Sequence, residues 1–149
     1  MYRILQTEAY RKWFRKLRDY AAKYSIALRL ERMRSGNFGD SKSVGGGDLT
    51  MEKLTEFDTA EYLDTEKLQK GYLDYVAKEG TEEELLKAIA DVARARGMAK
   101  TAKEAGITRE GLYKALSLKG NPSFSTVWKL LRSIGYTLTP TPIANAEQV

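Results

Sequence analysis

Residues 98–116, MAKTAKEAGITREGLYKAL, have the spacing of two short helices joined by a tight turn. Two helices that cross closely need a small side chain where they touch, and Ala102 provides one. Gly106 follows four residues later, where the turn requires a positive φ that glycine adopts at little cost. The core between the two helices is expected to be filled by Ile107, Leu112 and Ala115. The stretch therefore predicts a helix-turn-helix unit.

The second helix of this unit is predicted to expose polar and basic side chains. Thr108 is expected to be its N-cap, because a threonine hydroxyl accepts a hydrogen bond from the free amides of a first turn. The N-terminal side of such a helix can meet base edges and phosphates in the major groove. Arg109 suits paired hydrogen bonds to guanine, and Lys114 suits a phosphate. The predicted DNA contacts are Lys100, Thr108, Arg109, Glu110, Tyr113, Lys114, Lys119 and Asn121.

The alternative is a small helical bundle without a DNA-binding role, which the alanine-glycine spacing alone does not exclude. The pattern continues, however, through the turn sequence 120–123 into a further helix that ends near Gly135. The apolar positions of that helix are Phe124, Val127, Leu130, Leu131 and Ile134. Charge agrees with the motif, since residues 85–149 contain ten basic and four acidic side chains. These observations together favour DNA binding.

Composition narrows the function further. The 149 residues suffice for one ordinary domain or two small ones. Cysteine and histidine are both absent, which removes disulfides, thiolate nucleophiles, most zinc sites and the commonest general base. We therefore expect no enzyme activity, no metal and no cofactor. With no apolar run of about 18 residues and no apolar signal core, the sequence predicts a cytoplasmic protein without a membrane partner.

The rest of the chain predicts further helices and at most one short strand, near Tyr2–Gln6. Apolar residues recur at helical spacing from Tyr10 to Tyr24, and a second helix with Ile26, Leu30 and Met33 on one side ends at Gly36. Beyond a glycine-rich stretch, Asp64 or Thr65 is expected to cap a helix that runs to about Lys78 and closes at Gly80. Thr81 and Glu84 form a capping-box pattern that opens another helix to about Arg96.

Residues 51–138 resemble the HigA-type addiction-module antitoxins of the lambda-repressor-like class. The matching stretches are FDTAEYL (57–63), ARARGM (93–98), TREGLYKAL (108–116) and GNPSF (120–124). Thr101 departs from the aliphatic residue usual in that family, although its methyl group is a partial substitute. The resemblance implies a dimer or higher homo-oligomer that represses transcription at a palindromic operator in double-stranded DNA. Its half-sites would lie about one helical turn, roughly 34 Å, apart.

The first 47 residues resemble the beginning of a HigB-like toxin of the RelE/ParE superfamily. The matching residues are WF (13–14), LRD (17–19), the helix 26–34 and GNFGDSKSVG (36–45). Toxins of this superfamily are ribosome-associated ribonucleases whose later strands carry the RNA-binding arginines and tyrosines, and this chain lacks those strands. The resemblance therefore implies an inactive, truncated toxin fused in frame to an antitoxin.

The predicted domains are the toxin-like fragment 1–47, a linker 48–56, the antitoxin domain 57–138 and a tail 139–149. The fold class is mainly α, a lambda-repressor-like helix-turn-helix bundle preceded by a two-helix fragment. Residues 1–50 contain eleven basic and five acidic side chains, whereas residues 51–84 contain four and eleven. We therefore expect the fragment to pack on the helices between residues 64 and 96, within one chain or across a dimer. Its predicted packing residues are Trp13, Phe14, Leu17, Ile26 and Leu30.

Two alternatives concern the partners of the chain. The basic face of the first helix could instead be a solvated surface or bind phosphates without sequence specificity. That face consists of Arg11, Lys12, Arg15, Lys16 and Arg18. The second alternative is an interaction module that binds and neutralises an intact HigB/RelE-type toxin.

Overall fold

The computed structural model describes residues 1–40 and 53–144. These residues are mainly helical with one small two-stranded sheet, which confirms the predicted fold class. The chain divides into two compact units, Met1–Ala95 and Arg96–Val149, which are described separately. Part of the predicted linker 48–56 and part of the predicted tail 139–149 lie outside the described residues. The predicted domain boundaries stay predictions.

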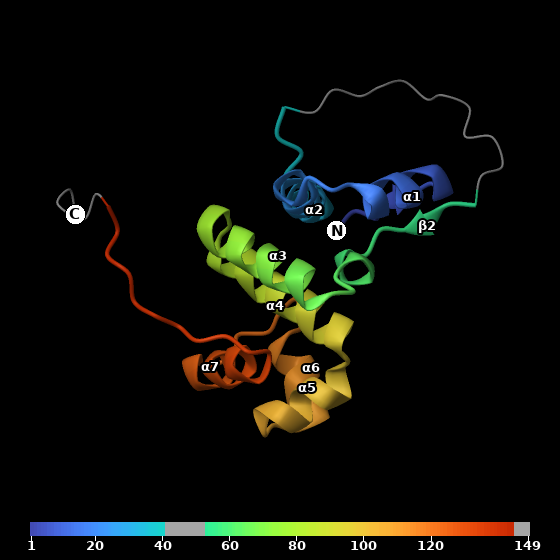
Figure 1. Cartoon of the computed structure of the whole chain (residues 1–149). Helices are drawn as coiled ribbons and strands as arrows, with labels where there is room; N and C mark the ends of the chain where they lie inside the picture. The colour runs from blue at the N-terminus through green and yellow to red at the C-terminus, as the bar shows by residue number, and fades with distance from the viewer. Residues whose placement is uncertain (41–52, 145–149) are drawn as a thin grey trace. The chain divides into compact units, whose positions relative to one another are not determined.

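The first unit consists of two short strands and a series of helices (Figure 1). Its elements are β1 (Leu5–Gln6), α1 (Glu8–Lys16), α2 (Tyr20–Arg34), β2 (Thr55–Glu56), the 3-10 helix η1 (Thr59–Tyr62), α3 (Glu66–Glu79) and α4 (Glu82–Arg96). β1 and β2 pair in an antiparallel manner, with Leu5 opposite Glu56. The sequence pattern did not indicate β2, because two residues are too few to show an alternation of apolar and polar side chains.

The two helices predicted between residues 64 and 96 are confirmed, together with their caps. The Thr65 hydroxyl accepts a hydrogen bond from the amide of Leu68 at 3.2 Å and begins α3. At the start of α4, the amide of Glu84 donates to the Thr81 hydroxyl at 3.3 Å, and the amide of Thr81 donates to the Glu84 carboxylate at 2.8 Å. These two bonds are the reciprocal capping box, which explains why α4 begins where it does.

The continuous helix predicted from Tyr10 to Tyr24 is wrong, because the chain breaks between α1 and α2. The backbone of Leu17 is extended, and the carboxylate of Asp19 accepts a hydrogen bond from the amide of Ala22 at 3.0 Å. An aspartate that caps a new helix in this way interrupts the preceding one. The apolar spacing continued across the break, so periodicity alone did not reveal it.

The side of α2 predicted to be apolar is not its buried side. Ile26, Leu30 and Met33 are partly exposed. The buried residues of α2 are Lys23, Tyr24, Ala27, Leu28 and Glu31. The two charged residues among them have polar partners, since the Lys23 amine donates to the Arg15 carbonyl at 3.2 Å and Glu31 accepts a bond from a threonine of η1 at 3.1 Å. Burial of satisfied polar groups gives no hydrophobic signal in the sequence.

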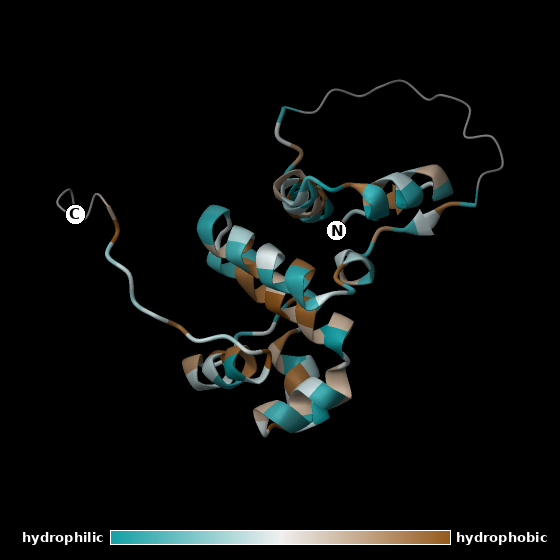
Figure 2. Ribbon diagram, in the orientation of Figure 1, coloured by the Kyte–Doolittle hydropathy of each residue, from teal (hydrophilic) through white to brown (hydrophobic). Residues whose placement is uncertain are grey.

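The core of the first unit lies where α2 packs on α3 and where α3 and α4 bury their apolar faces. α2 and α3 approach closely, because a Cβ at Gly71 would lie only 2.2 Å from the Tyr24 hydroxyl oxygen. Tyr72, Val76 and Ile89 are almost completely buried. Apolar and hydrophilic residues alternate along α3 and α4, as expected for helices with one face in the core (Figure 2).

The second unit contains α5 (Met98–Ala105), α6 (Arg109–Ala115) and α7 (Phe124–Ser133) (Figure 1). α5 packs against both α6 and α7. The buried residues are Thr101, Ala102, Ala105, Leu112, Leu130, Leu131 and Ile134. Thr101 is 1% exposed, so a threonine occupies a core position of this unit.

Candidate nucleic-acid interface

Gly106 forms the turn between α5 and α6 and so sets the orientation of α6. Its φ is +67°, a left-handed conformation that favours glycine, and its amide donates to the carbonyl of Lys103 at 3.2 Å. The next amide, that of Ile107, donates to the Ala102 carbonyl at 3.1 Å. Ala102 itself is 3% exposed. These bonds close the end of α5 and fix the direction in which the chain enters α6.

Thr108 begins α6 and uses its hydroxyl as a cap. The Thr108 Oγ1 atom accepts a hydrogen bond from the amide of Gly111 at 3.0 Å. Leu112 anchors the helix from its inner side, with no exposed surface. The other face presents four of the predicted contact residues to solvent, namely Arg109, Glu110, Tyr113 and Lys114. α6 is therefore a short helix held by one apolar anchor and exposed along a polar face.

Arg109 and Tyr113 form a pair on this exposed face. The guanidinium carbon of Arg109 lies 5.5 Å from the centre of the Tyr113 ring. A hydrogen bond with Tyr113 raises the pKa of Arg109, so the guanidinium keeps its charge. Stacking on an aromatic ring also reduces the number of rotamers open to a long side chain. The arginine is thus partly ordered before any ligand arrives.

A cavity of about 460 Å³ lies beside the C-terminal end of α6. The predicted residues Lys114, Lys119 and Asn121 line it together. The rest of its lining is Gly111, Ala115, Ser117, Gly120, Pro122, Ser123 and Thr126. A Cβ at Gly120 would lie 2.3 Å from the Ala115 carbonyl oxygen, so this loop packs on α6 only because residue 120 is a glycine. The structure therefore brings six of the eight predicted DNA contacts onto α6 and the loop that follows it. These are Arg109, Glu110, Tyr113, Lys114, Lys119 and Asn121.

The two remaining predicted contacts are Thr108, at the start of α6, and Lys100, on α5. Thr108 is exposed, but its hydroxyl is already used in the cap. Lys100 lies on α5, and its amine is 3.9 Å from the Glu104 carboxylate. We therefore rank these two below the residues that line the exposed face of α6 and the cavity.

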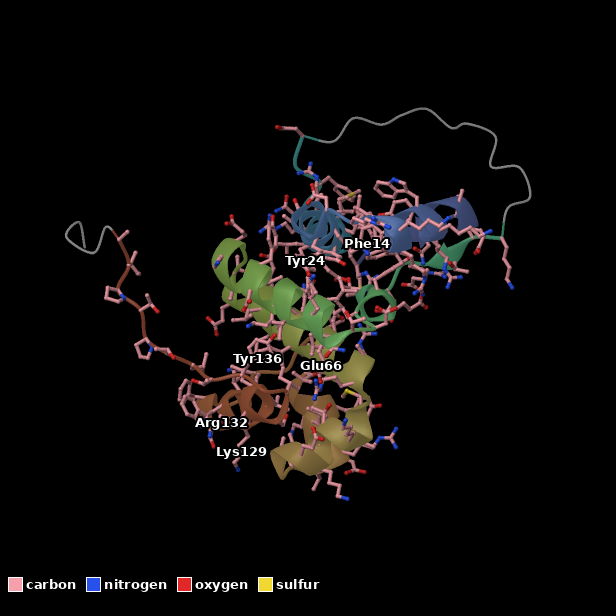
Figure 3. All side chains as sticks on the ribbon, in the orientation of Figure 1. Phe14, Tyr24, Glu66, Lys129, Arg132 and Tyr136 are labelled. Carbon is pink, nitrogen blue, oxygen red and sulfur yellow. The ribbon has the colours of Figure 1, made fainter. Side chains whose placement is uncertain are left out.

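Sequence reasoning missed a second exposed group on α7. Phe124, counted among the apolar positions of this helix, is 71% exposed, and its ring lies 6.0 Å from that of Trp128. Lys129 and Arg132 on the same helix are also exposed and are labelled in Figure 3. The spacing of four residues between Phe124 and Trp128 was visible in the sequence, but it does not show whether an aromatic pair is buried.

The N-terminal segment, defined here as residues 1–40, packs α2 on α3 and also contacts the following part of the first unit along what we name the acceptor face. The acceptor face consists of Thr55, Glu56, Phe57, Glu61, Tyr62, Asp64 and Glu84. The strand pair β1–β2 is extended by a bond from the amide of Phe57 to the carbonyl of Ile4 at 2.8 Å. Tyr62 donates a hydrogen bond to the side chain of Gln6. The segment is therefore joined to the acceptor face by backbone pairing as well as by side chains.

Phe14 is the apolar anchor of the N-terminal segment. It is 1% exposed, and its ring centre lies 4.7 Å from that of Tyr62 and 5.8 Å from that of Phe57. Its neighbour Trp13 is 50% exposed. Of the other predicted packing residues, Leu17, Ile26 and Leu30 are partly exposed. Phe14 and Tyr24, which is buried on α2, are both labelled in Figure 3.

Basic side chains of the N-terminal segment meet acidic ones on the acceptor face. Arg32 makes a two-point contact with Glu84, in which the Nε atom lies 2.7 Å and the Nη2 atom 3.1 Å from the two carboxylate oxygens. This bond lowers the pKa of Glu84, which therefore stays ionised. The looser pairs are Arg11 with Glu61 at 3.6 Å and Arg15 with Asp64 at 3.8 Å. Exposed pairs of that length stabilise little, so Arg32 is the main electrostatic contact.

A buried polar cluster lies behind the acceptor face. Arg94 donates hydrogen bonds to both Asp91 and Asp58. Asp91 is 5% exposed, and burial raises its pKa to about 7, with the nearby Glu31 carboxylate adding to the effect. The hydrogen bonds of Arg94 join α4 to Asp58, the residue before η1.

Within residues 1–40 and 53–144, no group of acidic side chains is arranged to hold a metal ion. None of the helices in these ranges combines the length and the apolar character needed to cross a bilayer.

Residues 53–142 match the protein family described as "Probable addiction module antidote protein". The chain belongs to this family, whose members have an antitoxin role in toxin-antitoxin systems. An antidote implies a cognate toxin as its partner, and membership favours a regulatory rather than an enzymatic role.

Two relatives are uncharacterized proteins of Haemophilus influenzae. One is 48% identical over 83 residues, which make up 56% of this chain and 86% of the relative. The other is 43% identical over 44 residues, which make up 30% of this chain and 44% of that protein. No solved structure matches the chain.

Proposed function

We propose that the chain is a HigA-type antitoxin that represses transcription by sequence-specific binding to double-stranded DNA. The observation that carries the proposal is the single polar surface formed by α6 and the loop after it. Arg109, Tyr113 and Lys114 are exposed on α6, and Lys119 and Asn121 line the cavity together with Lys114. A short helix with a free polar face and a basic flank suits the major groove.

Each residue of this surface has a role that its chemistry supports. Arg109, ordered over Tyr113, is placed to make paired hydrogen bonds to guanine. Lys114 and Lys119 are suited to phosphates on either side of that contact. Asn121 can donate to a phosphate or to a base edge. Residues 96–149 contain eight basic and three acidic side chains, so long-range attraction to DNA favours binding as well.

Dimerisation is part of the proposal, because one α6 reads only a few base pairs. A two-fold symmetric pair of chains would place two copies of α6 about one helical turn, roughly 34 Å, apart on a palindromic operator. The setting we propose is the cytoplasm.

The proposal also concerns the origin of the chain. Residues 1–47 are interpreted as a truncated, inactive HigB/RelE-like toxin fragment joined by the linker 48–56 to the antitoxin domain 57–138, with a tail 139–149. The interpretation is supported by the basic character of the fragment and by its packing on the acidic part that follows. In its described residues 1–40 the fragment has one two-residue strand, β1, which is too little sheet to position catalytic side chains.

The DNA-binding proposal is tested by measuring the affinity of the full chain for the DNA upstream of its own gene. We expect a specific complex whose affinity falls about 5- to 150-fold when Arg109 is replaced by alanine, with relaxed preference at one base pair. Lys114→Ala should lower the salt slope by about one unit, because it removes one phosphate contact. Lys103→Ala is the matched control, since Lys103 is an exposed lysine of α5 outside this surface. Equal affinity for operator and unrelated DNA would contradict the proposal.

A second candidate function is neutralisation of an intact HigB/RelE-type toxin. Membership of the antidote family favours it. The test is co-purification of the full chain with such a toxin and relief of the toxin's growth inhibition. The acceptor face matters for this candidate because it is a surface that a toxin could bind. In this chain the N-terminal segment already covers it.

A further inference from the structure

We propose that the acceptor face is the toxin-binding surface of this antidote and that the N-terminal segment occupies it as a tethered ligand. The free partner would be a separate protein that presents the same elements, an extended strand followed by a basic helix with one buried aromatic residue. The inference rests on the antitoxin part of the proposed function and is independent of DNA binding. Three features of the acceptor face carry it.

The first feature is a strand edge. β2 pairs with β1 and, in the part of the chain that the structure describes, with no other strand. The amide of Phe57 adds a further bond to Ile4. Removal of the N-terminal segment would leave these backbone groups unpaired. An unpaired edge binds an incoming strand of another chain by the same hydrogen bonds.

The second feature is an aromatic slot. Phe57 is 1% and Tyr62 3% exposed while Phe14 lies against both rings. Without Phe14 the slot would present two large aromatic side chains to water, and apolar patches of that kind mark interaction sites. A partner residue that fills the slot must be aromatic or large and apolar, because the neighbouring contacts are ring to ring.

The third feature is charge. Glu61, Asp64 and Glu84 of the acceptor face each meet an arginine of the N-terminal segment. Residues 51–84 as a whole contain eleven acidic and four basic side chains. The acceptor face therefore attracts a basic partner and repels an acidic one. A partner that combines an extended strand with a basic helix and an aromatic anchor fits all three features, whereas the acidic side chains repel a nucleic acid.

Tethering makes the chain's own segment a strong competitor. A ligand that is covalently joined to the chain carrying its site can have an effective concentration of roughly a millimolar there. If the segment and the partner both bind with an intrinsic dissociation constant of about a micromolar, the intact chain should bind the partner roughly 1,000-fold more weakly than a chain whose segment can leave. The covered acceptor face thus acts as a built-in block to toxin binding.

The test compares the full chain with the same chain cut between its two parts. A protease recognition sequence is inserted after Gly47, outside the described residues, and the purified protein is cut or left uncut. The probe is a fluorescent peptide of residues 1–40, added in excess and left to exchange overnight. We expect the peptide to replace the cut segment, and we expect the uncut chain to bind it at least 100-fold more weakly. Equal binding to both forms, or no binding to the cut chain, would overturn the proposal.

Variant peptides identify the contacts. Phe14→Ala in the peptide should weaken exchange at least 10-fold, because it empties the aromatic slot. Trp13→Ala is the matched control, since its side chain is half exposed, and a change of less than about 3-fold is expected. Arg32→Ala should weaken exchange more than Arg18→Ala, because Arg32 bonds to Glu84 whereas the side chain of Arg18 is exposed. Equal effects within either pair would contradict the binding mode.

DNA binding of the same samples separates this inference from the proposed repressor function. A cut chain that exchanges the peptide but binds no operator DNA supports the acceptor face and contradicts the repressor proposal. A cut chain that binds operator DNA but never exchanges the peptide supports the repressor proposal and contradicts the proposed role of the acceptor face.

Discussion

Replacing Phe14 by alanine removes the side chain at the centre of the aromatic cluster in the first unit. Phe14 is 1% exposed, and its ring contacts those of Tyr10, Phe57 and Tyr62 at centre-to-centre distances of 5.6, 5.8 and 4.7 Å. Loss of a buried phenylalanine costs about 3–5 kcal/mol, because it combines lost burial with a cavity. The free energy of unfolding of a small domain is about 5–15 kcal/mol, so the first unit should lose a large part of its stability.

The two tryptophans allow each unit to be followed separately. Trp13 lies in the first unit and Trp128 in the second. Urea unfolding of a chain that keeps only Trp13 reports the first unit, and one that keeps only Trp128 reports the second. We expect Phe14→Ala to lower the free energy of unfolding from the Trp13 signal by about 3–5 kcal/mol and to leave the Trp128 transition within about 0.5 kcal/mol.

Tyr20→Ala is the matched control for this measurement. Tyr20 is an aromatic residue of α2 that is 37% exposed, so its removal should cost about 1 kcal/mol or less. A loss below about 1 kcal/mol for Phe14→Ala, or a loss equal to that of Tyr20→Ala, would refute the burial of Phe14 against Phe57 and Tyr62.

Three other variants test single features of the two units. Burial raises the pKa of Asp91 from 3.8 to about 7, so between these values the folded first unit holds a proton that the unfolded chain has released. Its free energy of unfolding should therefore fall by up to about 1.4 kcal/mol for each unit by which the pH rises from roughly 4 to 7. Asp91→Asn should remove this dependence in urea titrations, and an unchanged slope would show that Asp91 ionises normally. Gly106→Ala should lower the free energy of unfolding of the second unit by about 1 kcal/mol, because residue 106 has a positive φ. Gly106→Asn should lower it less, because asparagine tolerates that conformation better than alanine. Equal urea midpoints for the two variants would argue against the left-handed turn. Thr108→Ala should destabilise α6 by about 1 kcal/mol and weaken operator binding, while Thr108→Ser should retain both; wild-type melting of the alanine variant would mean that the cap contributes nothing.

The parts of the fold that sequence reasoning predicted are those set by local chemistry. The caps at Thr65, Thr81 and Thr108 and the turn at Gly106 each depend on residues within a few positions of one another. Such signals are complete within a short stretch of sequence, and for this reason the helix starts of α3, α4 and α6 were found.

The parts that were missed depend on distant residues. The break at Asp19 was overlooked because apolar spacing continued across it, although aspartate before an apolar run was a usable signal. The buried face of α2 could not be found from hydropathy, because it includes Lys23 and Glu31, whose partners lie on other elements. The pairing of β1 with β2 joins residues about fifty positions apart and leaves no local pattern.

The candidate site shows the same division. Residues on α6 were predicted because helical spacing places them on one face. The cavity beside Lys119 and Asn121 depends on how the loop packs on Ala115, which only the close approach at Gly120 reveals. The exposure of Phe124 depends on tertiary packing and was not visible in the sequence.

Footprinting of the full chain on the DNA upstream of its own gene tests the central claim most directly. We predict two protected half-sites of inverted sequence whose centres lie about one helical turn apart, and we predict that Arg109→Ala abolishes protection at the guanine of each half-site first. Protection without a two-fold pattern, or protection that Arg109→Ala leaves unchanged, would contradict the account.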